Sequence, residues 1–301
     1  MGCGSEPAPS EDPGAPPEEV AEAPAPDFDE EVYRRSFTFI TLEADSVVAV
    51  PWFFQARTHP EGVLREIQGW VLRNGAWEPF VEEQRDSPPT RSPWRILPGE
   101  NTRIIAGNDD GLEALVFQEG GRQLRLGLAG LVTEWSSPQG EAFRIHRGRA
   151  TILAESMEGL ILDVQGGGTG GSPGPGDWAF LVSGDSLQVY LDHPPGREGV
   201  PNAGRAWTRL DLVDSHWPDL TVEWTETRPF ERARRDVPSR WRFQTPGEDV
   251  VGELEAGPSH LEVLEGEGPI LPVHGVVQVT GVVRMGDREL PVVGLMRHGQ
   301  S

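Results

Sequence analysis

Residues 274–295 read HGVVQVTGVVRMGDRELPVVGL, and this stretch decides the fold class. Four of its larger apolar residues occupy alternate positions on either side of Gly281: Val277, Val279, Val283 and Met285. That spacing places side chains on one face of a β-strand. Gly286-Asp287 follows, and such a pair supplies the positive φ angles of a tight hairpin. The stretch therefore predicts two antiparallel strands joined by a short turn.

The same alternation recurs from Ser36 to the end of the chain. It is clearest in residues 37–41, 124–128, 187–191, 220–224 and 241–243. Turn dipeptides separate such runs at Asn74-Gly75, Gly120-Gly121 and Gly184-Asp185. Roughly eighteen candidate strands follow at the short spacing that is typical of antiparallel sandwiches and barrels. We therefore expect an all-β protein.

One short helix is expected within this β-rich chain. Residues 229–236 read PFERARRD, with Pro229 at a plausible first helical position and Glu231 in the first turn. Pro238 would then end the helix. The pattern predicts two helical turns at the end of a barrel or sheet.

A glycine-rich segment divides the folded region. Residues 166–176 read GGGTGGSPGPG, and the apolar strand pattern WAFLV follows at 178–182. A phosphate-binding loop would require a helix there. We interpret 166–176 as a linker between a first β-barrel or sandwich at 33–165 and a second at 177–301. Each half is long enough for about eight strands.

The first 32 residues predict a disordered acidic tether. Residues 1–31 contain ten acidic residues, seven prolines and no basic residue. Such a segment cannot bury enough apolar surface to offset the entropy cost of ordering it. Its start, Met1-Gly2-Cys3-Gly4-Ser5, resembles the mature end of a bacterial lipoprotein. That resemblance implies a lipid on Cys3, with N-myristoylation and an unmodified Cys3 as the alternatives.

Composition excludes several classes of function. The chain has 48 acidic and 26 basic residues, a net charge of −22, and every basic residue is Arg. Without Lys there is no Schiff-base or phosphate-loop lysine. Such acidity argues against a nucleic-acid partner. The one Cys can form neither an internal disulfide nor a Cys-based zinc site.

The C-terminal segment also resembles a known family. His274–Gly286 continues to Pro291–Leu295, and Ser239–Phe243 lies upstream. Together they resemble the end of the AttH/CrtC lipocalin-like proteins, which include carotenoid 1,2-hydratases. The resemblance implies two antiparallel lipocalin-like barrels, and only the fold is carried over. The aromatic motif of the family's first barrel is absent, with Val50–Phe54 the nearest stretch, and Met296-Arg297-His298 stands where a Glu usually follows Gly294.

Tryptophan is the most informative residue type for a ligand site. The chain has ten Trp and two Tyr. Inward-facing positions of a barrel either fill its core or line a cavity for an apolar ligand. The candidate ligand-binding residues, all in the second half, are Trp178, Trp207, Arg209, Trp224, Trp241 and Arg242. A packed core is the alternative role for the tryptophans.

A metal site is the alternative interpretation of one polar region. His193, Asp214 and His216 carry ligand types that suit zinc or non-haem iron. Their neighbourhood is rich in Pro and Asp, which is typical of exposed loops. We therefore assign no metal site, no cofactor and no catalytic residue.

Two functions remain open. The first is an extracytoplasmic lipocalin-like protein that binds a hydrophobic small molecule and is anchored to a membrane, in the periplasm or at the cell surface. The second is a hydratase- or cyclase-type enzyme for a terpenoid or polyketide, which requires a buried carboxylate or His with a perturbed pKa. Its candidate groups are His193, Asp214, His216 and His298. A structural or assembly role through exposed sheet edges is a third possibility.

Overall fold

The computed structural model describes residues 30–42, 47–107, 111–137, 140–169, 177–193, 199–266 and 268–300. In these ranges the chain forms β-strands and turns and no helix, which confirms the all-β class. Nor is there, in the same ranges, a helix long and apolar enough to cross a bilayer. Cys3 and the tether before residue 30 lie outside the described residues, so the lipid anchor stays a prediction.

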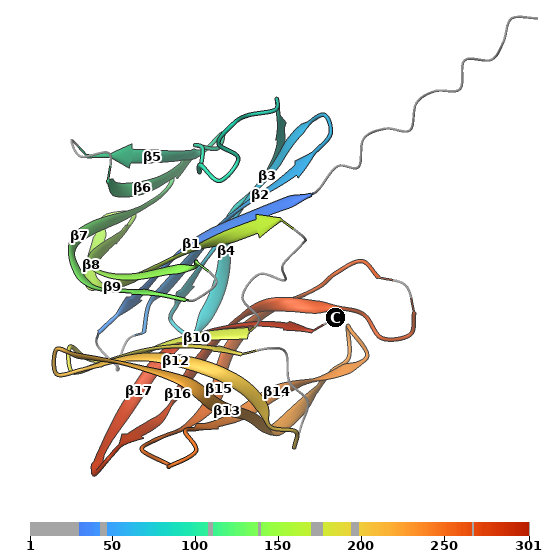
Figure 1. Ribbon diagram of the computed structural model, residues 1–301. Helices are drawn as coiled ribbons and strands as arrows, with labels where there is room; N and C mark the ends of the chain where they lie inside the picture. Colours follow the sequence, from blue (N-terminus) through green and yellow to red (C-terminus); the bar gives the residue numbers. More distant parts are fainter. Residues whose placement is uncertain are drawn as a thin grey trace, which may run out of the picture.

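The chain builds two bodies that follow one another in sequence (Figure 1). The strands of the first are β1 (Glu31–Thr41), β2 (Ala49–His59), β3 (Gly62–Arg73), β4 (Ala76–Ser87), β5 (Thr102–Ala106), β6 (Leu112–Glu119), β7 (Arg122–Ser136), β8 (Ala142–Ile152) and β9 (Glu155–Thr169). The strands of the second are β10 (Asp177–Ser183), β11 (Leu187–His193), β12 (Asn202–Leu210), β13 (Val213–Phe230), β14 (Arg235–Gln244), β15 (Val250–Val263), β16 (Val273–Met285) and β17 (Arg288–Gln300).

The first body is a nine-stranded antiparallel sheet that curls into a nearly closed barrel. Its order is β4-β3-β2-β1-β9-β8-β7-β6-β5, so β4 and β5 are its two edges. Side chains connect the β4 edge to β6 and β7 across the opening of the sheet. Phe80 of β4 meets Phe117 of β6 with ring centroids 5.4 Å apart, and Arg122 donates a 2.7 Å hydrogen bond to the carbonyl of Pro79.

The second body is a closed barrel of eight antiparallel strands, because β10 pairs with both β11 and β17. Alternate residues of each strand point inward and fill the interior with a continuous apolar core. Its bulkiest members are Trp224, Trp241 and Phe243, each no more than 2% exposed. Two barrels were expected, and two are present.

The four predicted turns are confirmed. Gly75, Gly120, Gly184 and Gly286 all have positive φ and each follows or precedes paired strands. The helix predicted at 229–236 is wrong. β13 runs on to Phe230, the chain turns at 231–234, and β14 starts at Arg235, which pairs with Phe230. The turn is closed by the amides of Ala233 and Arg234, which bond to the carbonyls of Phe230 and Glu231.

The two sheets are joined near the predicted linker. β9 continues through Gly166 to Thr169, and β10 begins at Asp177. Residues 170–176 lie outside the described residues. β10 contributes Trp178 and Phe180 to the apolar layer that it shares with the first barrel.

Candidate functional site

The two barrels pack against each other through a shared apolar layer, which we call the inter-barrel core. Barrel 1 contributes outward-facing side chains such as Phe143, Leu160 and Leu162. Barrel 2 contributes the outward-facing side chains of Trp178 and Tyr190, among others. The ring centroids of Phe143 and Tyr190 are 4.4 Å apart. This packing fixes the wall of the cavity that opens beside it.

That cavity, the inter-barrel pocket, has a volume of about 80 Å³ and is lined by both barrels. Phe53 and Trp70 supply aromatic walls from β2 and β3, and Trp178 supplies one from β10. Six ionisable residues line the same space: Arg34, Arg35, Glu66, Glu141, His274 and Arg297. Aromatic walls with convergent polar groups are typical of small-molecule sites, and a volume of about 80 Å³ holds only part of a drug-sized ligand.

Arg297 is one of three arginines that line the pocket, with Arg34 and Arg35. Its guanidinium lies 5.6 Å from the centroid of the Phe53 ring, and no carboxylate in the described part of the chain forms an ion pair with it. Burial lowers the pKa of Arg297, although Asp177 and Tyr190 oppose the shift. The cation nevertheless persists near neutral pH. A buried guanidinium without a counter-ion favours a ligand oxygen that carries negative charge.

Glu141 is the pocket's candidate acid. Burial, helped by the nearby charge of Asp192, raises the pKa of Glu141 despite opposing effects of Ser137 and Arg205. Its carboxylate is 3.7 Å from Arg205. A Cβ atom on Gly166 would approach the Cγ of Glu141 to 3.0 Å, so glycine leaves room for this side chain. A carboxyl group with a raised pKa is suited to donate a proton near neutral pH.

His274 is held by a carboxylate. Its Nε2 lies 3.0 Å from one oxygen of Glu262, and the Nε2 of His260 lies 2.9 Å from the other. Glu262 and His274 are directly opposite in the β15–β16 ladder. Burial raises the pKa of Glu262, but its bonds to both imidazoles outweigh this and lower it. When Nε2 of His274 donates to Glu262, its Nδ1 is left able to accept a proton.

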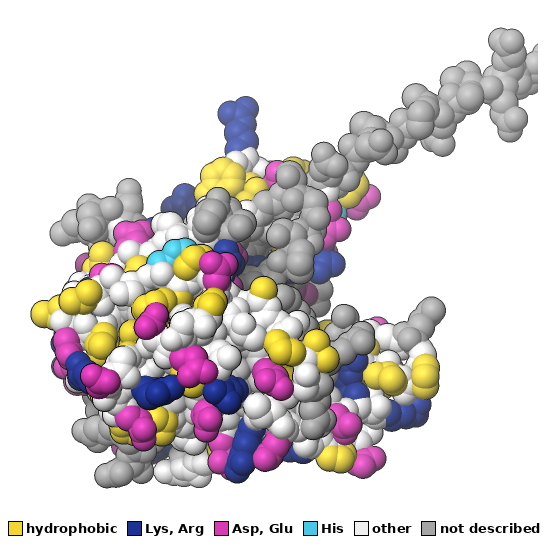
Figure 2. All heavy atoms as spheres, turned by 60° about the horizontal axis from the view of Figure 1, so that its bottom comes forward, with side chains coloured by type: hydrophobic (Ala, Val, Ile, Leu, Met, Phe, Trp, Pro, Cys, Tyr) yellow, Lys and Arg dark blue, Asp and Glu magenta, His cyan; other side chains and the backbone are white. Residues whose placement is uncertain are grey.

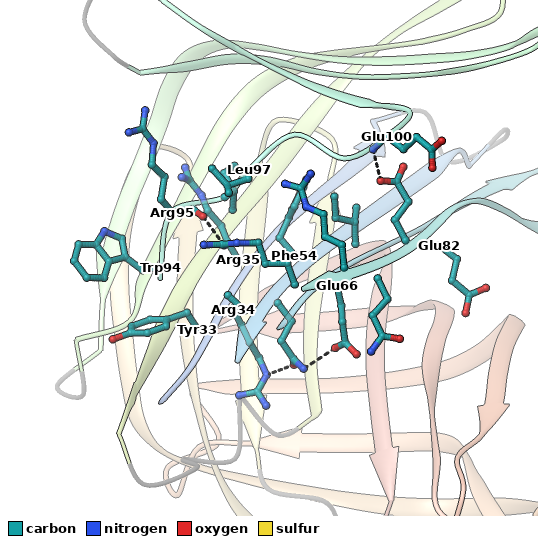
Figure 3. A pocket seen from close by; sticks show the side chains of 18 residues that line it. Tyr33, Arg34, Arg35, Phe54, Glu66, Glu82, Trp94, Arg95, Leu97 and Glu100 are labelled. Atoms are coloured by element: carbon teal, nitrogen blue, oxygen red, sulfur yellow. Dashed lines mark hydrogen bonds between the residues drawn. The ribbon is translucent and has the colours of Figure 1, made fainter. Parts of the chain in front are cut away.

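A larger cavity of about 360 Å³, the barrel-1 cavity, adjoins the inter-barrel pocket (Figure 3). Both are lined by Arg34, Gln55 and Glu66. Arg34 donates a 3.0 Å bond to Gln55, which donates a 2.8 Å bond to Glu66. This chain of side chains crosses β1, β2 and β3 in order. It links the two cavities through polar groups already bonded to one another.

The predicted ligand residues are not gathered at one place. Trp178 lines the inter-barrel pocket, whereas Trp207 belongs to the inter-barrel core and stacks on His216 at 4.7 Å. Arg209 pairs with Asp214 at 2.8 Å on the outside of the second barrel. The structure thus brings one of these three to the candidate site.

The other three candidates are also separated. Trp224 and Trp241 point into the packed core of the second barrel. Arg242 follows Trp241 on β14, so its side chain points to the outer face of the barrel. There it lines a surface groove with Glu253, its partner in the β14–β15 ladder. Figure 2 turns the bottom of the view in Figure 1 toward the reader, and acidic and basic side chains are intermingled on the face that it shows.

The polar candidates have individual partners. His298 is buried in the second barrel with its Nδ1 2.6 Å from Asp177. Asp214 and His216 are engaged with Arg209 and Trp207 respectively. The side chain of His193 lies outside the described residues. Across the described ranges, no three His, Cys, Asp or Glu side chains are grouped so that they could hold a metal ion.

Glu141, His274 and Arg297 were not singled out from the sequence. His274 and Arg297 lie on strands whose inward and outward residues are both buried, so alternation alone does not say which face meets the first barrel. Glu141 lies just before β8, and its burial depends on packing against residues distant in sequence. A signal was present in the polar residues at 274 and 297, which border the apolar runs 275–277 and 292–296.

No protein-family model and no curated protein sequence matches the chain. Solved structures do match its fold. They include kievitone hydratase from Nectria haematococca, with 13% identity, a TM-score of 0.54, and coverage of 88% of this chain and 87% of that one. They also include a putative AttH protein from Nitrosomonas europaea, with 12% identity, a TM-score of 0.51, and coverage of 94% and 98%.

A third similar structure is CghA in complex with Sch210972, with 13% identity, a TM-score of 0.50, and coverage of 89% of this chain and 87% of that one. The match extends over both barrels in each case. The chain therefore has the double-barrel, lipocalin-like fold of these proteins. The fold expected from the C-terminal resemblance to AttH-type proteins is confirmed.

Proposed function

We propose that the protein is an enzyme of the hydratase or cyclase kind, which acts on an unsaturated terpenoid or polyketide in the inter-barrel pocket. The observation that carries the proposal is the presence, in one pocket with aromatic walls, of the Arg297 guanidinium, which has no ion-pair partner among the described residues, and of the Glu141 carboxyl group, whose pKa is raised. Perturbed titratable groups in a cleft are a physical signature of catalysis. The fold shared with kievitone hydratase supports the same class.

The roles follow from the chemistry of the three groups. In hydration of a carbon–carbon double bond, protonated Glu141 gives its proton to one carbon and a water molecule supplies hydroxide to the other. His274, oriented by Glu262, takes the remaining proton of that water. Arg297 binds the carbonyl oxygen that is conjugated to the double bond and stabilises the negative charge that develops on it as hydroxide adds. Proton exchange with solvent restores Glu141 and His274.

Pure ligand transport has less support. The interior of the second barrel, where a carried molecule was expected, is filled by its own side chains. A carrier also has no use for an acid with a raised pKa in its ligand site. The apolar ligand class expected from the sequence is retained, and its site moves to the space between the barrels.

The test uses prenylated phenols and α,β-unsaturated aryl ketones in ¹⁸O-labelled water, with products followed by mass spectrometry. The wild-type protein is expected to add one labelled water to at least one compound. Glu141→Gln is expected to lower turnover by roughly 10²- to 10⁴-fold while binding is retained, because it removes the proton donor. Wild-type turnover should fall as the pH rises through the raised pKa of Glu141.

Two controls make the result specific. Arg240→Gln removes an exposed guanidinium that pairs with Glu226 on the second barrel, and it should leave turnover unchanged. Arg297→Met should weaken binding of compounds that carry a ketone or phenol oxygen. Tight binding of the whole panel without conversion would contradict the enzyme proposal and favour a carrier.

A further inference from the structure

The barrel-1 cavity has the properties of a binding site of its own. It lies on the inner face of the first sheet, where residues 92–100 cross the ends of β1 to β4 (Figure 3). Its volume of about 360 Å³ falls within the usual range for small-molecule pockets. Phe54, Ile67, Ile96 and Leu97 give it an apolar surface. At its rim, Trp94 is half exposed and packs edge-on against Tyr33 at 6.0 Å.

Two arginines face each other inside this cavity. Arg65 of β3 and Arg85 of β4 are directly opposite in the antiparallel ladder, so their side chains share the inner face. Arg65 is 7% exposed. Burial and, secondly, the charge of Arg85 lower the pKa of Arg65. Like charges directly opposite on a sheet are destabilising unless something neutralises them.

The described residues do not neutralise this pair. Arg65 donates to neutral oxygens, namely the carbonyls of Pro93 at 3.2 Å and Arg95 at 2.9 Å and the hydroxyl of Ser87 at 3.3 Å. No ion pair involving Arg65 or Arg85 is present in the part of the chain that the structure describes.

The nearest acidic groups are committed elsewhere. The Glu83 carboxylate accepts hydrogen bonds from the backbone amides of Glu100 and Asn101. Asp163 forms a bidentate pair with Arg35, at 2.9 and 2.8 Å. Figure 3 shows Glu82 and Glu100 pointing away from Phe54 and Leu97. In a protein with a net charge of −22, the lining of this cavity has five arginines and four glutamates, an excess of positive charge.

We propose that the barrel-1 cavity binds an anionic amphiphile, with its carboxylate on Arg65 and Arg85 and its apolar chain against Phe54, Ile67, Ile96 and Leu97. Charge-assisted bonds between guanidinium and carboxylate are strong and geometrically specific. A bound carboxylate also removes the repulsion within the arginine pair. Because Arg65 holds the carbonyls of Pro93 and Arg95, the ligand would fix the segment that covers the cavity. This site does not depend on catalysis in the inter-barrel pocket.

The test is calorimetric titration of the full chain with decanoate, with 1-decanol and acetate as matched probes. Decanoate is expected to bind at least tenfold more tightly than decanol, and acetate more weakly than either. Arg85→Gln should weaken decanoate binding at least tenfold and leave decanol binding unchanged. Arg85 is exposed, so its replacement should not prevent folding.

The matched control is Arg125→Gln, which makes the same charge change on an exposed strand position of the first barrel away from the cavity. It should leave decanoate binding unchanged. Equal binding of decanoate to the wild-type protein and Arg85→Gln would overturn the proposal, and so would decanol that binds as tightly as decanoate or the absence of decanoate binding. These outcomes can be distinguished from a failure of the hydratase proposal. If the protein converts no substrate in the inter-barrel pocket, the expected binding of decanoate to Arg65 and Arg85 does not change.

Discussion

At the scale of single residues, the best-defined polar interaction is the buried pair of His298 and Asp177 in the second barrel. Both side chains are 1% exposed, and Asp177 also accepts a 2.7 Å hydrogen bond from the amide of Gly299. His298 is further bonded to Gln300 at 3.1 Å. Each group is thus fully engaged with protein, which is the condition under which a buried charge is tolerated. The pair joins β10 to β17 where the barrel closes.

The stability of this pair should depend on pH. Burial lowers the pKa of His298, but the charge of Asp177 and the bonds to Asp177 and Gln300 outweigh burial and raise it. A raised folded-state pKa means that the stabilisation is complete below the unfolded pKa of about 6.5 and is lost as the pH rises through the folded value. The contribution of this pair to the free energy of unfolding of the wild-type protein should therefore decrease as the pH rises above about 6.5.

The comparison variant is His298→Gln, which cannot become charged and leaves Asp177 buried without its counter-ion. We expect it to be less stable than the wild-type protein by about 3–5 kcal/mol at pH 6, with a smaller deficit at pH 9. Urea unfolding followed by tryptophan fluorescence at several pH values measures this difference. A deficit that stays constant over the range would show that the charge on His298 is not involved.

At the scale of strands, glycine marks places where two backbones come close. Gly281 lies opposite Leu254 in the β15–β16 ladder, and a Cβ atom there would overlap the carbonyl oxygen of Glu253. Gly257, on β15, has only ordinary contacts at 3.5 Å or more around the same imaginary atom. The two glycines of this strand pair therefore have different tolerances for a side chain.

Gly281→Ala should destabilise the protein by about 2–3 kcal/mol, since the backbone of β15 must shift to admit the methyl group. Gly257→Ala is the matched control and should change stability by less than about 1 kcal/mol. Thermal unfolding of both variants measures the difference. Equal losses would mean that close approach at Gly281 is not what excludes a side chain.

Strand patterns predicted the elements better than the site. Hairpins with an alternating pattern and a glycine turn, such as the one around Gly286, are determined by local chemistry and were found from the sequence. The face of each strand that meets the other barrel is not local. Trp178 and Ala179 are both fully covered, one against the first barrel and one inside the second, so their hydrophobicity does not distinguish the two roles.

At the scale of the whole molecule, the inter-barrel core makes the two barrels one structural unit. It contains buried side chains from both, and Trp77 of β4 adds a 2.9 Å hydrogen bond to the carbonyl of Pro258 in β15. The pocket proposed for catalysis exists because of this contact. Whether a lipid at Cys3 holds this unit at a membrane remains a prediction from the sequence.

The barrels should therefore unfold together. Calorimetry is expected to show one unfolding transition for the wild-type protein. Phe143→Ala should lower the free energy of unfolding by about 3–5 kcal/mol, and the protein should still unfold in a single transition. Phe143 is fully buried and lies 4.9 Å from the ring of Trp207 across the contact. Two separate transitions, with only one of them shifted by the substitution, would show that the barrels are independent.

The two barrels differ in how they are closed, because the edge strands β4 and β5 of the first sheet are not paired with each other. The circumference of the second barrel is set by a complete ring of backbone ladders, so any dilation would break hydrogen bonds. Between β4 and the strands β6 and β7, the first barrel is joined by side chains, namely the rings of Phe80 and Phe117 and the hydrogen bond from Arg122 to the carbonyl of Pro79, rather than by a backbone ladder. We therefore expect the width of the first barrel to change more easily than that of the second.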